Sequence, residues 1–258
     1  MNIASNGILL YVDEQGDGDM SLVFLHYWGG SSRTWRHVIA ALPKSYRTIA
    51  IDHRGWGESD APATGYALSD LADDAQGVVD ALNLKRYMLI GHSMGGKVAQ
   101  LMASRRPDGL IGLVLVAPSP PQPLALPAEA REAMAAAYST RDSVGTAIDQ
   151  MLTAKVLSTE DREQVIEDSL RGAPQAKAAW PRSTSFEDIT RDVAAINAPT
   201  IVVAGSARCP ACVARDRASV AVGVAAGTCP GDRRLRRCTS ESSLAQTAQR
   251  SASPQSKD

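Results

Sequence analysis

The chain reads Tyr-Met-Leu-Ile-Gly-His-Ser-Met-Gly-Gly over residues 87–96. Its apolar start is typical of a buried parallel strand, and Gly-x-Ser-x-Gly after a strand is typical of a tight strand-to-helix turn. In such a turn Gly91 and Gly95 let the backbone pass close to its neighbours, and His92 supports the turn. Ser93 then stands at a helix N-terminus, where the dipole favours negative charge. We therefore predict that Ser93 is a catalytic nucleophile; the alternative is a turn serine with no role.

A second glycine-containing stretch, His-Tyr-Trp-Gly-Gly at residues 26–30, also follows a short apolar run. Attack on an acyl group builds negative charge on the carbonyl oxygen, which needs two fixed hydrogen-bond donors. We predict that the backbone N–H groups of Trp28 and Met94 are these oxyanion donors, with His26 and Gly29 supporting the loop. An ordinary glycine turn with a hydrogen-bonded histidine is the alternative.

A third motif, Asp-His-Arg-Gly-Trp-Gly-Glu-Ser-Asp at residues 52–60, follows another strand pattern. It is placed near the expected site because active sites of parallel sheets lie at the carboxyl ends of the strands. We expect its Asp, Arg and Ser to shape the loop through hydrogen bonds rather than to perform chemistry.

Strand and helix patterns alternate around these motifs. Strands are predicted at 6–14, 21–26, 46–52, 86–91, 110–117 and 198–205, and helices at 31–42, 69–83 and 94–105. Ser69 is the expected N-cap of the second helix. This alternation implies βαβ crossovers, and therefore an α/β fold with a mostly parallel, doubly wound sheet.

The residues between the last two predicted strands contain only helical patterns. Helix start signals occur at Ser143 and at Ser158, after a proline-rich segment. The predicted division is a core of residues 1–118 and 191–206, a helical insertion of residues 119–190, and a separate C-terminal segment of residues 207–258. Several apolar side chains of the insertion suggest either an apolar pocket or ordinary helix packing, and we favour packing for most of them: Met134, Tyr138, Met151 and Trp180.

The three motifs together resemble those of the α/β-hydrolase superfamily, in the group of small bacterial esterases, cofactor-free haloperoxidases and carbon–carbon bond hydrolases. The resemblance covers residues 6–206 and is specific for fold rather than for substrate. It implies that residues 119–190 form a helical cap over the acyl site. The family usually has glycine where this chain has Tyr27, which is expected to crowd or reshape the oxyanion loop. Ser93 argues against the haloalkane dehalogenase and epoxide hydrolase branches, which have aspartate at this turn, and favours esters, lactones, thioesters or vinylogous ketones.

The catalytic base and acid are missing from their expected places. A serine hydroxyl needs a histidine base held by a carboxylate, and the resemblance places both after Ser93. Where the family continues Gly-Ser-Ala-Asp, this chain reads Gly-Ser-Ala-Arg at residues 205–208. Every histidine of the chain precedes the serine: His26, His37, His53 and His92.

The triad acid and base are therefore unknown. His26 and His53 are on loops at the expected sheet edge and are the remaining candidates for the base. The side chain of His92 is expected to point away along the turn. Asp188 and Asp192 are expected to be solvated helix charges.

The composition changes near residue 207. After Ile201 the chain has no aromatic residue and no Ile, Met, His or Asn, and from Arg208 onward it has nine Lys/Arg against four Asp/Glu. This composition is typical of GC-rich DNA read out of frame, so we hypothesise an altered reading frame near codon 207. We expect residues 207–258 to be disordered and the family's last strand and helix to be absent.

All cysteines of the chain lie in this segment, at Cys209, Cys212, Cys229 and Cys238. The first pair has the spacing of a zinc ligand pair, but the second pair is nine residues apart. We therefore expect neither a metal site nor a redox site.

Length and composition limit the class of protein further. A formal net charge of −1 gives no reason to expect nucleic acid or an anionic membrane as partner. The chain lacks the apolar run of about 18 residues that a membrane span requires, and its N-terminus has no secretory pattern. We expect a cytoplasmic protein without a cofactor.

These observations predict a serine hydrolase acting on small carboxylic esters as its small-molecule partners. Its activity is expected to be impaired, because the histidine and aspartate of the triad are missing. Two alternatives remain: a non-catalytic, ligand-binding homologue of the hydrolases, and a haloperoxidase-like perhydrolase. The sequence leaves substrate identity and oligomeric state open.

Overall fold

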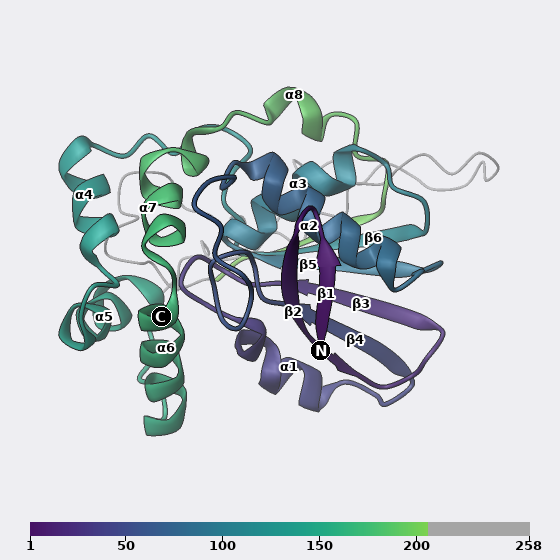
Figure 1. The fold of residues 1–258 in the computed structure, drawn as a ribbon, viewed down its shortest axis with the longest axis horizontal. Coiled ribbons are helices and arrows are strands. Elements are labelled where there is room, and N and C mark those ends of the chain that lie inside the picture. The colour runs from purple at the N-terminus through teal and green to yellow at the C-terminus, as the bar shows by residue number, and fades with distance from the viewer. Residues whose placement is uncertain (206–258) are drawn as a thin grey trace, which may run out of the picture. The chain divides into compact units, whose positions relative to one another are not determined.

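The computed structural model describes residues 1–205, whose strands form one seven-stranded sheet (Figure 1). The strands lie in the order β1-β2-β4-β3-β5-β6-β7, with the bounds β1 Asn2–Ser5, β2 Ile8–Gln15, β3 Met20–Leu25, β4 Tyr46–Ile51, β5 Tyr87–His92, β6 Leu110–Val116 and β7 Thr200–Val203. β1 and β2 pair antiparallel, as do β2 and β4, and all other neighbours pair parallel. The predicted mostly parallel α/β sheet is confirmed.

Helices cover both faces of this sheet, because successive strand residues point to opposite sides. Leu22 and Phe24 of β3 pack with Trp35, whereas Val23 and Leu25 belong to the larger core cluster on the other face. The helices of the core are the 3₁₀-helix η1 Ser32–Trp35, α1 Arg36–Ala41, α2 Leu68–Ala81 and α3 Met94–Ser104. The first two lie on one face, and α2 and α3 lie on the opposite face (Figure 1).

The N-terminus contains one strand that was not predicted. The pattern at 6–14 corresponds to β2, which forms a hairpin with β1. Asn6 and Gly7 make the turn with φ values of 47° and 79°, a backbone region that glycine and asparagine adopt most easily.

Two predicted helix starts differ from those observed. The pattern at 31–42 is divided into η1 and α1, and Ser31 caps the first of them. Ser69 lies inside α2, so its prediction as N-cap was wrong. The helix begins after Ala67 because the carboxylate of Asp70 accepts a hydrogen bond from the Ala67 N–H group, at 2.8 Å.

Between β6 and β7 every regular element is helical. These elements are α4 Ala128–Ala136, α5 Arg141–Ala147, the π-helix η2 Ile148–Leu152, α6 Thr159–Arg171, α7 Pro174–Arg182, the 3₁₀-helix η3 Thr184–Phe186 and α8 Thr190–Val193. Ser158 caps α6 as predicted, by accepting from the Asp161 N–H group. Ser143 does not cap α5; Thr140 does, and Ser143 is the third residue of that helix.

This helical segment packs on the core through one apolar cluster. The cluster includes Trp28, Trp56 and Met94 from the core and Tyr138, Val144, Ile148, Ile166 and Trp180 from the helical segment. Tyr138 and Trp180 are buried in it, and Met134 packs against it. Met151 is 42% exposed. Packing, the favoured interpretation, therefore describes Met134, Tyr138 and Trp180.

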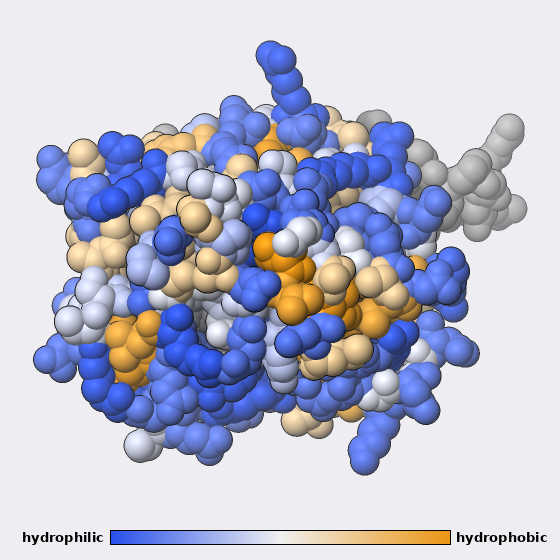
Figure 2. All heavy atoms as spheres, viewed as in Figure 1, coloured by the Kyte–Doolittle hydropathy of each residue, from blue (hydrophilic) through white to orange (hydrophobic). Residues whose placement is uncertain are grey.

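The surface seen in Figure 2 is mostly hydrophilic, with apolar side chains gathered in a few small patches. Within residues 1–205, no helix is long and apolar enough to cross a membrane. The predictions made for residues 207–258, including the cysteines, the altered composition and the missing last strand and helix, lie outside the described residues.

Candidate active site

Ser93 occupies a strained turn between β5 and α3. Its backbone has φ 51° and ψ −110°, which costs a residue other than glycine on the order of 1–3 kcal/mol. Hydrogen bonds hold the turn on both sides: the Ser93 N–H group donates to the Val116 carbonyl at 3.1 Å, and the Ser93 carbonyl accepts from the N–H group of Ser119 at 3.0 Å. The end of β6 thus fixes the conformation of this serine.

The glycines of the turn allow close contact between backbones. A Cβ atom on Gly91 would lie less than 3.0 Å from backbone atoms of Gly95 and Gly96. A Cβ atom on Gly95 would lie less than 3.0 Å from the carbonyl oxygens of Leu25 and His26. The start of α3 is therefore packed directly against the end of β3, where the stretch 26–30 begins.

Among the described residues, the groups predicted to carry chemistry make no internal hydrogen bonds. Ser93 is partly exposed, and its hydroxyl has no hydrogen-bond partner within residues 1–205. The backbone N–H groups of Trp28 and Met94 also have no hydrogen-bond partner in this part of the chain. Unoccupied N–H groups beside a helix N-terminus can bind a developing oxyanion.

His26 supports the stretch that contains Trp28. Its Nδ1 lies 2.7 Å from the Tyr27 carbonyl oxygen, and its Nε2 accepts from the His53 N–H group at 3.0 Å. Because a carbonyl can only accept, we assign the proton to Nδ1 of a neutral ring. Burial lowers the pKa of His26, in agreement with that assignment. Both ring nitrogens are thereby engaged, and neither can serve as a base for Ser93.

Tyr27 stands where the family usually has glycine, and the turn of residues 26–30 forms with it in place. Its carbonyl accepts from the Gly30 N–H group at 3.0 Å, closing a turn. Its ring lies 5.3 Å from the His92 ring, and a Cβ atom on Gly30 would collide with it. The tyrosine ring thus packs across the glycine and along the serine turn.

The other histidines of the described chain also form no hydrogen bond with Ser93. The His53 ring packs on the His26 ring at 4.6 Å, and its buried Nε2 has no partner within residues 1–205. Burial, followed by the nearby His26, lowers the pKa of His92 to about 4. His37 is on the surface and contacts Asp161 at 2.7 Å. Within residues 1–205, no histidine is therefore hydrogen-bonded to Ser93 as a base would be.

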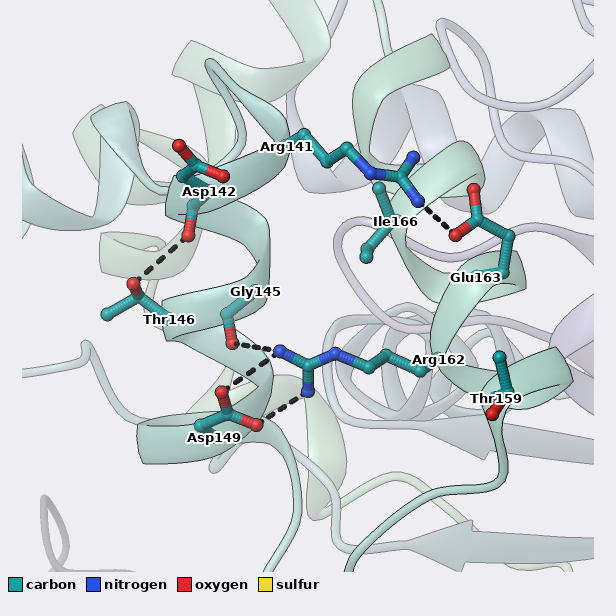
Figure 3. A pocket seen from close by; sticks show the side chains of 9 residues that line it. All are labelled: Arg141, Asp142, Gly145, Thr146, Asp149, Thr159, Arg162, Glu163 and Ile166. Atoms are coloured by element: carbon teal, nitrogen blue, oxygen red, sulfur yellow. Dashed lines mark hydrogen bonds and ion pairs between the residues drawn. The ribbon is translucent and has the colours of Figure 1, made fainter.

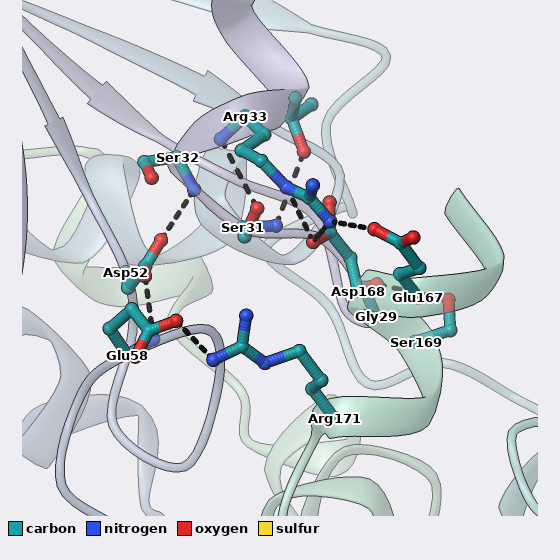
Figure 4. A network of polar contacts seen from close by, with 11 residues as sticks. Gly29, Ser31, Ser32, Arg33, Asp52, Glu58, Glu167, Asp168, Ser169 and Arg171 are labelled. Carbon is teal, nitrogen blue, oxygen red and sulfur yellow. Dashed lines mark hydrogen bonds and ion pairs between the residues drawn. The ribbon is translucent and has the colours of Figure 1, made fainter. Parts of the chain in front are cut away.

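The motif at 52–60 shapes its loop mainly through Asp52. This buried carboxylate accepts from the backbone N–H groups of Ser32, at 2.5 Å, and Glu58, at 2.9 Å (Figure 4). The Ser59 hydroxyl donates to the Asp52 carbonyl at 2.7 Å. Asp52 thus ties the loop after β4 to η1.

Arg54 is not part of that network, contrary to the prediction. It forms a buried, two-bond ion pair with Asp74 of α2, with both N–O distances 2.6 Å. Arg54 also donates to the Gly65 carbonyl of its own loop, so it shapes the loop and joins it to a helix of the core, but without bonding to Asp52 or Ser59.

Two contacts from the helical segment reach the stretch 26–30, and neither was predicted. The Tyr138 hydroxyl donates to the Trp28 carbonyl at 3.1 Å, and the Ser169 hydroxyl donates to the Gly29 carbonyl at 3.0 Å. The partners are separated by 110 and 140 residues, and no local pattern in the sequence indicates such pairs.

Two cavities near the helical segment are polar and do not include Ser93. One, of about 170 Å³, lies between Asp52, Arg33 and Arg171. The other, of about 380 Å³, lies between α5 and α6, where Arg141 pairs with Glu163 and Arg162 pairs with Asp149 (Figure 3). Neither has the apolar lining that an acyl chain would favour.

Comparison with known proteins decides the family. A sequence model of the α/β hydrolase fold family matches residues 21–144. The chain is 30% identical over 224 residues to the 2-hydroxy-6-oxononadienedioate/2-hydroxy-6-oxononatrienedioate hydrolase of Burkholderia vietnamiensis, covering 80% of this chain and 77% of that protein. The chain belongs to the α/β-hydrolase superfamily.

Other matches place this α/β-hydrolase among proteins with several named activities. It is 41% identical over 110 residues to an epoxide hydrolase of Caballeronia sordidicola, a match that covers 42% of the chain but 33% of that protein. Its fold is similar to that of a bromoperoxidase from Bacillus anthracis, with a TM-score of 0.73 and 23% identity over 80% of this chain and 82% of that one. The likeness to the bromoperoxidase shows the fold alone.

Proposed function

We propose that this α/β-hydrolase acts on small carboxylic esters, with Ser93 as nucleophile and the N–H groups of Trp28 and Met94 as oxyanion donors. The observation that carries the proposal is the strained, partly exposed serine at the start of α3, whose hydroxyl has no partner within residues 1–205. Strain of this kind persists where the surrounding structure enforces it, and it is concentrated at functional sites.

The proposed reaction begins with attack of the Ser93 Oγ atom on the ester carbonyl carbon. The carbonyl oxygen becomes an oxyanion and binds the two N–H groups. The bond to the alcohol breaks, the alcohol leaves with a proton, and an acyl-serine remains. Water then attacks the acyl carbon, the bond to the Ser93 Oγ atom breaks, the carboxylic acid leaves, and a proton from water restores the serine hydroxyl.

Both halves of this reaction normally use a histidine base. We propose that turnover by this chain is impaired because that base is missing. No histidine follows Ser93 in this chain, and those before it make the contacts described above. Loss of the base lowers turnover by several orders of magnitude, although oxyanion donors alone retain roughly 10³–10⁴-fold catalysis over water. An ester with a good leaving group therefore remains a usable probe.

A similar protein supports hydrolysis as the function. One observation favours a second candidate function, ligand binding without turnover. The Burkholderia vietnamiensis protein is named a hydrolase and is similar over most of both chains. The absence of a histidine–serine hydrogen bond among the described residues favours a homologue that binds a ligand without turning it over.

The test is the hydrolysis of p-nitrophenyl acetate by the chain and by its Ser93→Ala variant, each with and without imidazole. We expect slow hydrolysis that depends on Ser93 and that imidazole accelerates more in the parent than in the variant, because imidazole substitutes for the missing base. The variant also measures the reaction of free imidazole with the ester. Equal rates in parent and variant, with and without imidazole, would reject the proposal in favour of the ligand-binding homologue.

A further inference from the structure

The stretch 26–30, here named the oxyanion loop, has three consecutive carbonyl groups that are each held by a hydrogen bond. The Tyr27 carbonyl is held from within the loop, by Gly30 and His26. The next two carbonyls are held by side chains of the helical segment: that of Trp28 by Tyr138, and that of Gly29 by Ser169.

These bonds fix the direction of the Trp28 N–H group. A peptide unit is planar and trans, so its N–H and C=O groups point in opposite directions, and holding one fixes the other. The Trp28 N–H group belongs to the unit whose carbonyl is that of Tyr27. The following unit is held at the Trp28 carbonyl by the Tyr138 hydroxyl. Both peptide planes that meet at Trp28 are therefore pinned, one from inside the loop and one from the helical segment.

Tyr138 is built into the loop by packing as well as by its hydroxyl. The side chain is 1% exposed, and its ring stacks on the Trp28 indole with centroids 4.1 Å apart. Gly29 has φ 96°, and a Cβ atom there would lie less than 3.0 Å from the Tyr138 ring. The glycine leaves the space that the tyrosine ring fills.

Ser169 is anchored beside the loop by an ion pair on its own helix. The preceding residue of α6, Asp168, is buried and accepts two hydrogen bonds from the Arg33 guanidinium, at 2.6 and 3.0 Å. Arg33 lies just after the oxyanion loop, so α6 contacts the loop at Gly29 and again beyond its end (Figure 4).

We propose that Tyr138 and Ser169 are positioning residues of the hydrolase site, through which the helical segment sets the geometry of the oxyanion loop. The inference rests on the proposed function for the role of the Trp28 N–H group. Displacement of the helical segment would release the carbonyls of Trp28 and Gly29, and with them the turn in which Gly30 holds the peptide unit of the Trp28 N–H group, so oxyanion binding depends on docking of this segment.

The test uses two variants that remove one hydroxyl each and keep the packing, Tyr138→Phe and Ser169→Ala. Thr184→Val is the matched control, because Thr184 is a buried residue of the same segment whose hydroxyl donates to a different carbonyl, that of Tyr66, at 2.7 Å. All three lose one hydrogen bond from a buried side chain to a backbone carbonyl, so a merely structural effect would be shared by all three.

Two quantities are measured. Amide hydrogen exchange of a peptide covering the oxyanion loop reports whether the loop is held, with no need for activity. The second is the rate at which an alkyl fluorophosphonate labels Ser93, followed by intact mass, with Ser93→Ala as blank. In that reaction the serine oxygen bonds to phosphorus, fluoride leaves and the proton goes to solvent, so the rate reports stabilisation of the charged phosphoryl oxygen.

We expect faster exchange in the loop, and labelling about three- to tenfold slower, in each of the two positioning variants but not in Thr184→Val. Unchanged loop exchange in both variants overturns the inference. Faster loop exchange with an unchanged labelling rate also overturns it. In that case the two hydroxyls hold the loop in the parent but do not affect the reaction at Ser93. If the parent itself is not labelled, the proposed function fails, and the exchange data alone decide whether Tyr138 and Ser169 hold the loop.

Discussion

Gly95 shows how one residue joins the serine turn to the oxyanion loop. A methyl group at this position would lie less than 3.0 Å from the carbonyl oxygens of Leu25 and His26, which are backbone atoms and cannot turn aside. We predict that Gly95→Ala lowers the free energy of unfolding by about 1–3 kcal/mol, as overpacking of a core does. Urea unfolding of parent and variant measures the change.

Gly145 of α5 is the control for that substitution. A Cβ atom there would meet only the end of the Arg162 side chain, at 3.2 Å, and its helical backbone suits alanine. Gly145→Ala should leave stability unchanged or raise it by up to about 1 kcal/mol. Equal effects of the two substitutions would mean that the close approach at Gly95 carries no cost.

His92 makes the free energy of unfolding depend on pH. Its pKa is about 4 in the folded protein against 6.5 for an unperturbed histidine, because burial disfavours the charged ring. Between these pH values the unfolded chain binds more protons, so His92 contributes stability above pH 6.5 that is lost as the pH falls toward 4. We predict that His92→Gln reduces the slope of unfolding free energy against pH in this window by up to about 1.4 kcal/mol per pH unit. Parallel curves for parent and variant would contradict this assignment.

At the scale of elements, α2 is joined to the loop after β4 by the buried pair of Arg54 and Asp74. Both side chains are nearly inaccessible, and burial raises the pKa of Asp74 despite the neighbouring guanidinium. We predict that Asp74→Asn costs about 3–5 kcal/mol, because it leaves the buried arginine charge without a carboxylate to neutralise it. Asp73→Asn on the same helix should cost less than about 1 kcal/mol, since the pair of Asp73 with Arg105 is exposed. Equal unfolding midpoints in urea for the two variants would contradict the prediction.

Element starts show where reasoning from local sequence succeeds. Ser158 caps α6 as predicted, because its partner Asp161 is three residues away and the signal is complete in the sequence. Ser69 does not cap α2, because the N-terminus of that helix uses Asp70 and also a distant carboxylate, that of Glu187, which accepts from Leu68. Such a long-range bond overrides local preference.

At the scale of the whole molecule, the alternation of strand and helix patterns was sufficient to predict the parallel sheet and its helices on both faces. The serine turn was predictable because its glycines and its strand are adjacent in the sequence. The contacts of Tyr138 and Ser169 with the oxyanion loop were not, because a single sequence holds no signal for pairs more than 100 residues apart. The pairing of Arg54 with Asp74 was missed although the two residues are only 20 positions apart, because one lies on a loop and the other on the following helix, and no local pattern links them.

For the molecule as a whole, we propose that Ser93 is a nucleophile in a site without its histidine base. Acylation by an ester with a good leaving group needs little help from a base, whereas hydrolysis of the acyl-serine needs one to activate water. The acyl-enzyme should therefore accumulate.

Mass spectrometry and peptide mapping of the chain after incubation with p-nitrophenyl acetate, beside Ser93→Ala, distinguish these possibilities. We predict a single acetyl group on Ser93 that persists for many minutes and is absent from the variant. If Ser93 carries no acetyl group, it is not the nucleophile; if turnover is rapid and the acetyl group never accumulates, the chain supplies a base.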